Sequence, residues 1–212
     1  MLKEYKTSKK DVIKYSDFIS NYFYQQIAYF ITMFLLRTKF TPNQVTIVSL
    51  GLGIASAVSV FLNHQIIAII LLNISFILDC VDGQLARAKQ LFSPIGTWLD
   101  NISDRIVENS IVIAVTFLLE DKYIWSDAIL LVFANMFYTY VQDISLLNKI
   151  KYRPLFLYEK IIFSPIYFIS RSMLIPMLSL LILFPVIAIK ILLFLYSVGI
   201  IFRIYREITN AI

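Results

Sequence analysis

The sequence is poor in charge, and it has almost none of the residues that build disulfides or zinc sites. Only 16% of its 212 residues are charged and 59% are hydrophobic, whereas soluble domains carry about 25% charged residues. The single cysteine, Cys80, excludes a disulfide framework, and the single histidine, His64, falls in a predicted loop. Because the opening segment MLKEYKTSKKDVIKY is polar and basic, we expect no cleavable signal peptide. The composition predicts an integral membrane protein.

Linkers and repeats are also absent from the sequence. Only five glycines occur, and no Gly/Ser-rich linker, repeat or low-complexity tract interrupts the chain, so we expect a single domain over residues 1–212. A helix needs about 20 mostly apolar residues to cross a bilayer. We therefore predict an all-α integral membrane fold with six transmembrane helices, at residues 44–62, 65–86, 95–119, 124–147, 162–184 and 186–204.

The segment before the first span has a different pattern. Residues 15–38 mix aromatic and polar residues and predict an amphipathic juxtamembrane helix along the membrane interface, with a seventh span as the alternative. The TPN that follows, at 41–43, is typical of a helix start, with Thr41 as the cap and Pro42 in the first turn.

Lysine and arginine alternate between the connections. They are frequent in the N-terminal segment, in the second and fourth connections and in the C-terminal segment, which includes Arg203. They are missing from the first and fifth connections and balanced by acids in the third. The positive-inside rule then places both termini and the even-numbered connections in the cytoplasm. Because the net charge of +5 is spread between apolar runs rather than over one continuous face, we expect no nucleic-acid partner.

Four aspartates stand out in the apolar background of residues 77–109. They are Asp79, Asp82, Asp100 and Asp104. At about 100° per residue, the first two share a face of the second span and the last two share a face of the third, at a similar depth near the cytoplasmic side. Ionised carboxylates that converge in a low-dielectric site are costly unless cations compensate them.

Two interpretations of these acids follow. Oxygen ligands without a Cys/His cluster favour a hard divalent cation, Mg²⁺, Mn²⁺ or Ca²⁺. The structural alternative is that the acids pair with Arg87, Lys89 or Arg105 and hold the helices together. Glu108, one turn deeper than Asp104, either supports the acids by a hydrogen bond or pairs with an arginine elsewhere. Because acids within membrane spans are usually functional, the cation site is favoured.

The full pattern is more specific than four acids. It is Asp79-x2-Asp82-Gly83-x2-Ala86-Arg87-x8-Gly96-x3-Asp100-x3-Asp104. This pattern resembles the signature of the CDP-alcohol phosphotransferase family at every fixed position and every spacing. The resemblance extends to the six predicted spans, the amphipathic N-terminal helix and the TPNQVT at the start of the first span.

The resemblance implies an enzyme that transfers a phospho-alcohol unit from a CDP-alcohol to an acceptor hydroxyl and releases CMP. Carried over to this sequence, Asp79, Asp82 and Asp100 would ligate Mg²⁺ or Mn²⁺, as a pair of ions. Asp104 would be the general base, with or without a role as a ligand. The nucleotide contacts would come from Gly83, Arg87, Thr41 and Asn43. A homodimer in the cell membrane of a bacterium or archaeon is also implied.

The substrates are less constrained. The runs RTKFTPNQVTIVSLGLG and LDCVDGQLARAK resemble the branch of di-myo-inositol-phosphate phosphate synthases and choline/ethanolamine phosphotransferases, which favours a polar CDP-alcohol donor of the inositol, choline or ethanolamine type. The alternative donor is CDP-diacylglycerol. For the acceptor we expect Arg171, Lys149 and Arg153, although charges that set topology or bind lipid headgroups are an alternative for the last two. A cation carrier would also place carboxylates inside a helix bundle, but these acids cluster near one side.

Overall fold

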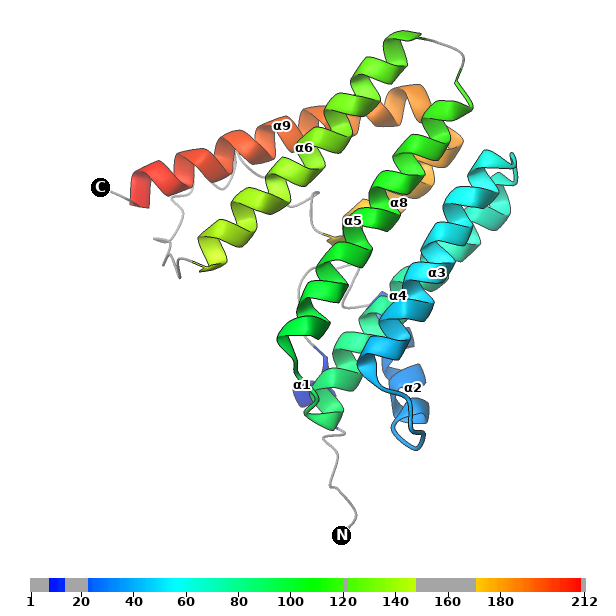
Figure 1. Ribbon diagram of the computed structural model, residues 1–212, viewed down its shortest axis with the longest axis vertical. Coiled ribbons are helices and arrows are strands. Elements are labelled where there is room, and N and C mark those ends of the chain that lie inside the picture. Colours follow the sequence, from blue (N-terminus) through cyan, green and yellow to red (C-terminus); the bar gives the residue numbers. More distant parts are fainter. Residues whose placement is uncertain (1–7, 14–22, 120–121, 148–170, 211–212) are drawn as a thin grey trace. The chain divides into compact units, whose positions relative to one another are not determined.

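The computed structural model describes residues 8–13, 23–119, 122–147 and 171–210, and these residues form helices without any strand. In chain order the helices are α1 (Lys9–Val12), α2 (Gln25–Leu35), α3 (Pro42–Phe61), α4 (Gln65–Lys89), α5 (Pro94–Phe117), α6 (Lys122–Leu147), α8 (Arg171–Leu183) and α9 (Pro185–Asn210), as Figure 1 shows. The contacts divide the chain into two compact units, Met1–Val115 and Thr116–Ile212, which we describe separately.

Four helical segments in the described part of the chain are long and apolar enough to cross a membrane. They are Pro42–Phe61, Gln65–Lys89, Lys122–Val141 and Pro185–Tyr205. They correspond, within a few residues at most ends, to the first, second, fourth and sixth spans that the sequence predicts.

The third and fifth predicted spans are not among these four segments. The third folds as the helix α5, Pro94–Phe117, but four charged side chains leave it outside the apolar class. These are Asp100, Asp104, Arg105 and Glu108. The fifth, 162–184, lies partly outside the described residues, and its described part is α8.

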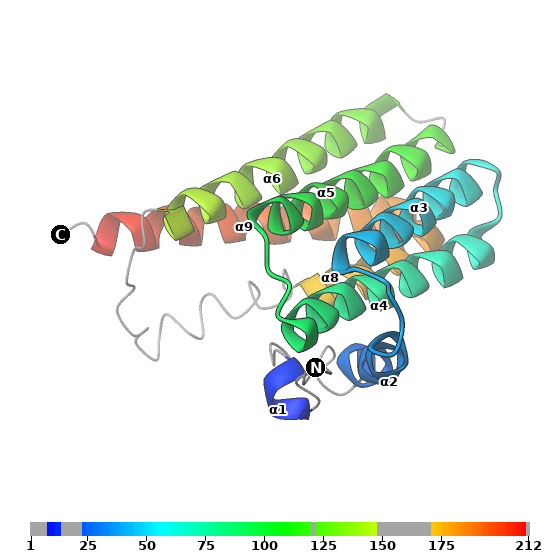
Figure 2. The ribbon, with the colours of Figure 1, turned by 60° about the horizontal axis from the view of Figure 1, so that its bottom comes forward.

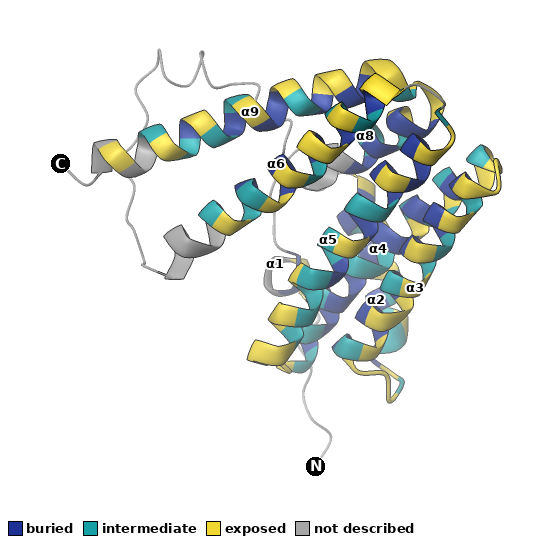
Figure 3. Cartoon of the chain, turned by 45° about the horizontal axis from the view of Figure 1, so that its top comes forward, coloured by how far each residue is buried: buried dark blue, intermediate teal, exposed yellow. Residues whose placement is uncertain are grey.

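The outer surfaces of the apolar helices carry large hydrophobic side chains. Only 33% to 39% of the most apolar window of each candidate span is buried. On α3, Ile47 and Val58 are about half exposed, and on α4 Ile66 is 74% exposed. Figure 3 shows these exposed faces in yellow beside the buried faces in dark blue. Such surfaces suit hydrocarbon rather than water.

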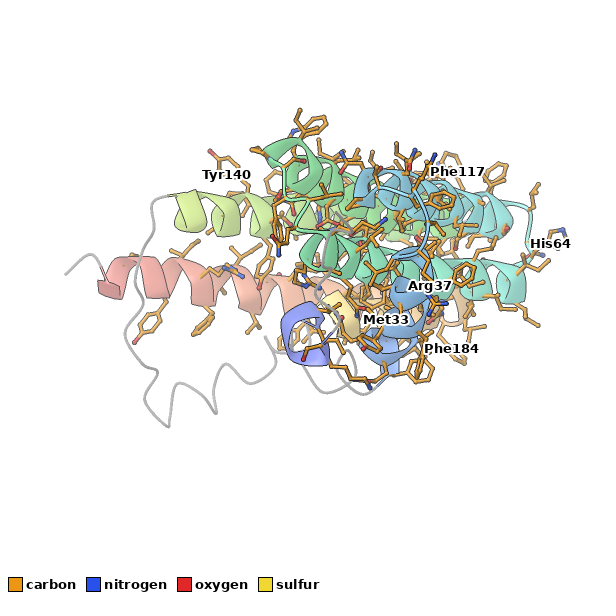
Figure 4. The ribbon with its side chains drawn as sticks, turned by 90° about the horizontal axis from the view of Figure 1, so that it is seen from below. Met33, Arg37, His64, Phe117, Tyr140 and Phe184 are labelled. Carbon is orange, nitrogen blue, oxygen red and sulfur yellow. The ribbon has the colours of Figure 1, made fainter. Side chains whose placement is uncertain are left out.

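In the first unit, α3 and α4 lie side by side and are joined by a short turn (Figures 1 and 2). Thr41 caps α3 as predicted: its hydroxyl accepts from the main-chain N–H of Gln44, and the Gln44 side chain accepts from the N–H of Thr41. His64 lies in the turn, is exposed and points outward (Figure 4), as expected for a loop residue.

Small residues let the helices of this unit approach closely. Ser49 donates to the carbonyl of Ser75 at 2.8 Å, and Ser75 donates to the carbonyl of Ser49 at the same distance. A Cβ at Gly53 of α3 would collide with the side chain of Val107 on α5, 2.8 Å from its Cγ1. Glycine at this position therefore permits the contact between α3 and α5.

The helix α2 packs on α4 with its polar side inward. Thr32 is fully buried and Gln25 is 9% exposed, whereas Phe30 and Phe34 are 70% and 71% exposed. The buried polar groups meet Gln84 of α4, whose Nε2 donates to the side-chain oxygen of Gln25 at 2.7 Å and whose Oε1 accepts from Thr32 at 3.2 Å. This described part of the predicted 15–38 helix is therefore amphipathic, with its apolar side outward.

A second polar contact holds the start of α2. The hydroxyl of Tyr24 donates to Oδ1 of Asn73 on α4 at 2.7 Å. Burial raises the pKa of Tyr24 above its usual value, so the phenol stays protonated and can donate.

In the second unit, α9 runs along α6, and α8 packs against α9 (Figures 1 and 2). Two polar contacts link α6 to α9: the hydroxyl of Tyr196 donates to Oδ1 of Asn135 at 3.1 Å, and Nη2 of Arg203 donates to the hydroxyl of Tyr138 at 3.0 Å. The guanidinium of Arg203 also lies 4.4 Å from the centre of the Tyr138 ring. Paired polar groups of this kind are tolerated within apolar helices.

Candidate metal and nucleotide site

The end of α4 and the start of α5 bring three carboxylates together. One oxygen from each of Asp79, Asp82 and Asp100 lies within 4.8 Å of the others. Asp79 and Asp82 are one turn apart on α4, and Asp100 lies in the second turn of α5. Asp82 is buried, with 6% of its surface exposed, and the other two carboxylates are half-buried.

This set of donors fits a hard divalent cation. All three ligands are carboxylate oxygens, which Mg²⁺, Mn²⁺ and Ca²⁺ prefer. Oxygens on opposite sides of one Mg²⁺ are about 4 Å apart, and around Ca²⁺ they are about 5 Å apart. A cluster within 4.8 Å can therefore close on a cation with little rearrangement.

Asp104 lies one turn beyond Asp100 on the same side of α5 and is half-buried. Among the described residues, the cluster of three carboxylates does not include it. Its role as a general base therefore stays a prediction from the sequence pattern.

A pocket of about 280 Å³ opens beside the carboxylates. Its walls come from α3, α4, the connection after α4 and α5, and include Asp82 and Asp100. Three of the four residues for which we predicted nucleotide contacts also line it: Asn43, Gly83 and Arg87. Thr41 is not part of the lining, and its side chain is used to cap α3. Thr41 therefore caps the helix, whereas Asn43, two residues later, lines the pocket.

Arg87, which lines the pocket, is held by a residue of the N-terminal segment. Its Nε donates to the main-chain carbonyl of Val12 at 2.5 Å, and Val12 is fully buried. The two Nη atoms lie 3.4 Å and 3.6 Å from the point where a Cβ on Gly83 would be. The N-terminal segment thus orients the guanidinium towards Gly83, which also lines the pocket.

The start of α5 is fitted against the start of α3. Ser93 caps α5, since its hydroxyl accepts from the N–H of Gly96 at 2.9 Å. A Cβ at Gly96 would lie 2.9 Å from both the Asn43 side-chain oxygen and the Ser93 hydroxyl. The glycine of the motif therefore makes room for Asn43 at the pocket wall.

The basic side chains near the acids have partners of their own. Lys89 donates to the carbonyls of Thr38 and Phe40, at 3.0 Å and 2.8 Å. Arg105 forms an ion pair with Glu108 at 2.7 Å, one turn along the same helix. Glu108 is therefore paired with an arginine, which lies on its own helix, α5, rather than elsewhere as expected.

The acceptor residues expected from the sequence lie mostly outside the description. Lys149 and Arg153 are not among the described residues. Arg171 begins α8, and nothing is described of its side chain. Arg203, which the sequence analysis used only as a marker of topology, is instead bound to Tyr138 within the second unit, and its Nε is buried with no hydrogen-bond partner among the described residues. The sequence feature that could have indicated a buried partner for Arg203 is its position inside an apolar span, Pro185–Tyr205.

Comparison with known proteins extends these observations. Residues 39–205 match the model of the CDP-alcohol phosphatidyltransferase family. Over 91 residues the chain is 41% identical to a bifunctional IPC transferase and DIPP synthase of Thermococcus kodakarensis, covering 43% of this chain and 21% of that protein. Over 75 residues it is 37% identical to an archaetidylinositol phosphate synthase of Pyrococcus horikoshii, covering 35% of this chain and 40% of that protein. The matches thus span less than half of these relatives.

Solved structures share the fold. The crystal structure of a Mycobacterium tuberculosis phosphatidylinositol phosphate synthase with CDP-DAG bound has a TM-score of 0.65 and 19% identity, covering 87% of this chain and 94% of that one. The same enzyme in complex with manganese and citrate has a TM-score of 0.60 and 18% identity, covering 85% and 87%. The apolar helices and the family match identify an integral membrane protein. With the full motif present and 39–205 matched, the chain belongs to the CDP-alcohol phosphatidyltransferase family.

Proposed function

We propose that this protein is a metal-dependent membrane enzyme that transfers a phospho-alcohol unit from a CDP-alcohol to an acceptor hydroxyl and releases CMP. The observation that carries the proposal is the cluster of Asp79, Asp82 and Asp100 beside a pocket lined by Gly83 and Arg87. The membership of the family supports the same reaction.

In the proposed reaction, the acceptor hydroxyl oxygen forms a bond to the phosphorus that carries the donor alcohol. The bond from that phosphorus to the bridging oxygen breaks, and its electron pair leaves with CMP. The hydroxyl proton passes to the carboxylate of Asp104. A divalent cation on the carboxylates, when bound, neutralises the charge that develops on the leaving phosphate.

The remaining residues bind and orient the donor. Arg87 can place its two Nη groups on phosphate oxygens, because its Nε is already bound to the carbonyl of Val12. Gly83 has no side chain to separate the phosphates from the helix backbone. Asn43, which also lines the pocket, offers an amide to the nucleotide. Each group is fixed by the first unit itself, which reduces the cost of ordering the site on binding.

For the donor we propose a polar CDP-alcohol of the inositol type. The support is the similarity to the bifunctional IPC transferase and DIPP synthase. CDP-diacylglycerol is the second candidate, and the observation that favours it is the shared fold with a synthase that was solved with CDP-DAG bound. Choline and ethanolamine donors remain in the same polar class.

We further propose a membrane arrangement for the enzyme. Residues 1–212 act as one domain with six spans, and α5 and the segment around α8 supply the third and fifth. Both termini and the carboxylate cluster face the cytoplasm, as the distribution of Lys and Arg predicts. The site holds two ions, Mg²⁺ or Mn²⁺, the chain forms a homodimer, and Arg171, Lys149 and Arg153 bind the acceptor.

The test is CMP release by the purified full chain in detergent with Mn²⁺ or Mg²⁺. CDP-inositol, CDP-choline, CDP-ethanolamine and CDP-diacylglycerol are each combined with polar and lipid acceptors, and Asp100→Asn is the matched control. Release that needs both metal and acceptor, and that Asp100→Asn loses, would support the proposal and identify the donor class. Metal-driven cation flux into proteoliposomes without nucleotide, together with no CMP release and no CMP binding, would replace it with the carrier interpretation.

A further inference from the structure

A buried hydroxyl on α3 binds one of the clustered carboxylates. Thr46 lies in the second turn of α3, and its Oγ1 donates to Oδ2 of Asp82 at 2.6 Å. Both side chains are buried, with 4% of Thr46 and 6% of Asp82 exposed. Neither the sequence pattern nor the proposed reaction has so far given Thr46 a role.

The proton of this hydroxyl is directed at the carboxylate. Oγ1 of Thr46 also lies 3.2 Å from the carbonyl oxygen of Pro42, four residues earlier. A hydroxyl has one proton, and distances of about 2.5–2.7 Å are typical of its bond to an ionised carboxylate. One of the two preferred rotamers of threonine in a helix places the hydroxyl near the carbonyl one turn earlier, which here is that of Pro42. The backbone of α3 therefore fixes where Oγ1 lies, and Oγ1 in turn fixes one oxygen of Asp82.

Other buried hydroxyls along the same contact between α3 and α4 bind main-chain carbonyls, and the Ser49 and Ser75 hydroxyls also lie 3.3 Å from each other. Ser49 and Ser75 exchange hydrogen bonds with each other's carbonyls, and Ser56 donates to the carbonyl of Ala68 at 2.7 Å. Those bonds hold the two helices in register. The bond from Thr46 differs because it ends on a functional side chain.

We propose that Thr46 is a positioning residue, which holds the carboxylate of Asp82 in the orientation that ligates a divalent cation together with Asp79 and Asp100. The inference rests on the proposed function, since it requires a cation at the three carboxylates. Rotation of the Asp82 carboxylate would break the bond from Thr46. Because the contact is buried, losing this donor would cost the carboxylate free energy.

The size of the effect can be estimated from comparable sites. Residues that hydrogen-bond to metal ligands typically change metal affinity by about 10-fold to 100-fold when they are removed. Thr46→Val keeps the shape of the side chain and removes the hydroxyl. Thr46→Ser keeps the hydroxyl and removes a methyl group. The two variants therefore separate the hydrogen bond from the packing.

The experiment measures Mn²⁺ affinity of the full chain in detergent, without substrate, from the electron paramagnetic resonance signal of free Mn²⁺. The unaltered protein is compared with Thr46→Val, Thr46→Ser and Ser56→Ala, and Asp82→Asn marks the loss of a ligand. Ser56→Ala is the matched control, because it removes a buried hydroxyl from the same helix contact, far from the carboxylates along α3. Thermal unfolding of every variant is measured in parallel, and Thr46→Ala replaces Thr46→Val if the latter does not fold.

Support would be a Mn²⁺ dissociation constant at least about 10-fold higher in Thr46→Val, with Thr46→Ser and Ser56→Ala within about threefold of the unaltered protein. Unchanged affinity in Thr46→Val would overturn the role of Thr46 while leaving the metal site intact. An equal loss in Thr46→Ser, or in Ser56→Ala, would assign the effect to packing and also overturn it. If the unaltered protein and Asp82→Asn bind Mn²⁺ equally, the proposed metal site itself fails, and this inference fails with it.

Discussion

The guanidinium of Arg87 is bound to the main-chain carbonyl of Val12, which lies 75 residues earlier in the sequence. The contact links the short helix α1 to the wall of the pocket, because Val12 is fully buried and Arg87 lines the pocket. An arginine whose Nε is already held needs less ordering when its Nη groups meet a phosphate.

We therefore predict that deleting residues 1–13 weakens CMP binding about tenfold, the order expected for one hydrogen bond to a charged group. The measurement is isothermal titration with CMP and Mn²⁺. Deletion of residues 1–7 is the control, since it leaves α1 and the Val12 contact in place. In an Arg87→Ala background the longer deletion should have no further effect, and an equal effect there would show that α1 acts through other residues.

Gly83 gives a prediction in which stability and binding move in opposite directions. The three heavy atoms nearest to a Cβ at this position all belong to the guanidinium of the flexible Arg87 side chain, the closest at 3.4 Å, so the fold itself does not require glycine. Alanine is a better helix former than glycine by about 1 kcal/mol. Gly83→Ala should thus unfold at the same or a higher temperature, while CMP affinity falls by about tenfold or more because the added methyl group belongs to a residue that lines the pocket.

Gly53→Ala is the matched control for this comparison. Here the added Cβ would collide with Val107, so the unfolding temperature should fall. Thermal unfolding in detergent, followed by circular dichroism, measures both variants. If Gly83→Ala binds CMP as well as the unaltered protein, the close approach of phosphate to the helix backbone is wrong.

Much of the site could be predicted from the sequence because helical spacing maps directly onto helix faces. Asp79 and Asp82 are three residues apart on one continuous helix, so their shared face needs only the geometry of an α-helix. The meeting with Asp100 follows once two consecutive helices are antiparallel. Four of the predicted spans were also found at nearly the expected residues.

The contacts that depend on packing between distant segments could not be predicted. The Val12 contact uses a main-chain carbonyl, which leaves no mark in the side-chain pattern. Thr46 ends the TPNQVT run at the start of the first span, but the run does not show a partner for its hydroxyl, and only the rotation of α3 against α4 directs this hydroxyl at Asp82.

The hydrogen bonds of Gln84 lead to a prediction about how α2 is held on α4. Its buried amide donates to Gln25 and accepts from Thr32, so Gln84→Leu would leave buried polar groups on α2 without these partners. A loss of about 1–3 kcal/mol is expected for such groups. Hydrogen–deuterium exchange of residues 25–35 should accelerate at least tenfold, while α3 keeps its protection.

Tyr24→Phe is the comparison variant for the contact between α2 and Gln84, since it removes a single hydrogen bond, to Asn73, at the start of α2. It should accelerate exchange less than Gln84→Leu does. Equal protection of α2 in Gln84→Leu and in the unaltered protein would show that apolar packing alone holds the helix.

Asp104 and Asp100 should respond differently to the same chemical change. They are one turn apart on α5, but only Asp100 belongs to the described cluster of three carboxylates. If Asp104 takes the acceptor proton, Asp104→Asn should lower the rate of CMP release by at least about 100-fold, because a general base contributes about 10²–10⁴. Its affinity for CMP and Mn²⁺ should stay within about threefold, since the amide keeps the shape and the three ligands remain.

Asp100→Asn should instead weaken Mn²⁺ binding and turnover together. Titration of both variants with Mn²⁺ and CMP, alongside single-turnover CMP release, separates the two roles. Equal loss of Mn²⁺ affinity in both variants would make Asp104 a ligand as well, and the proton of the acceptor would then need another route.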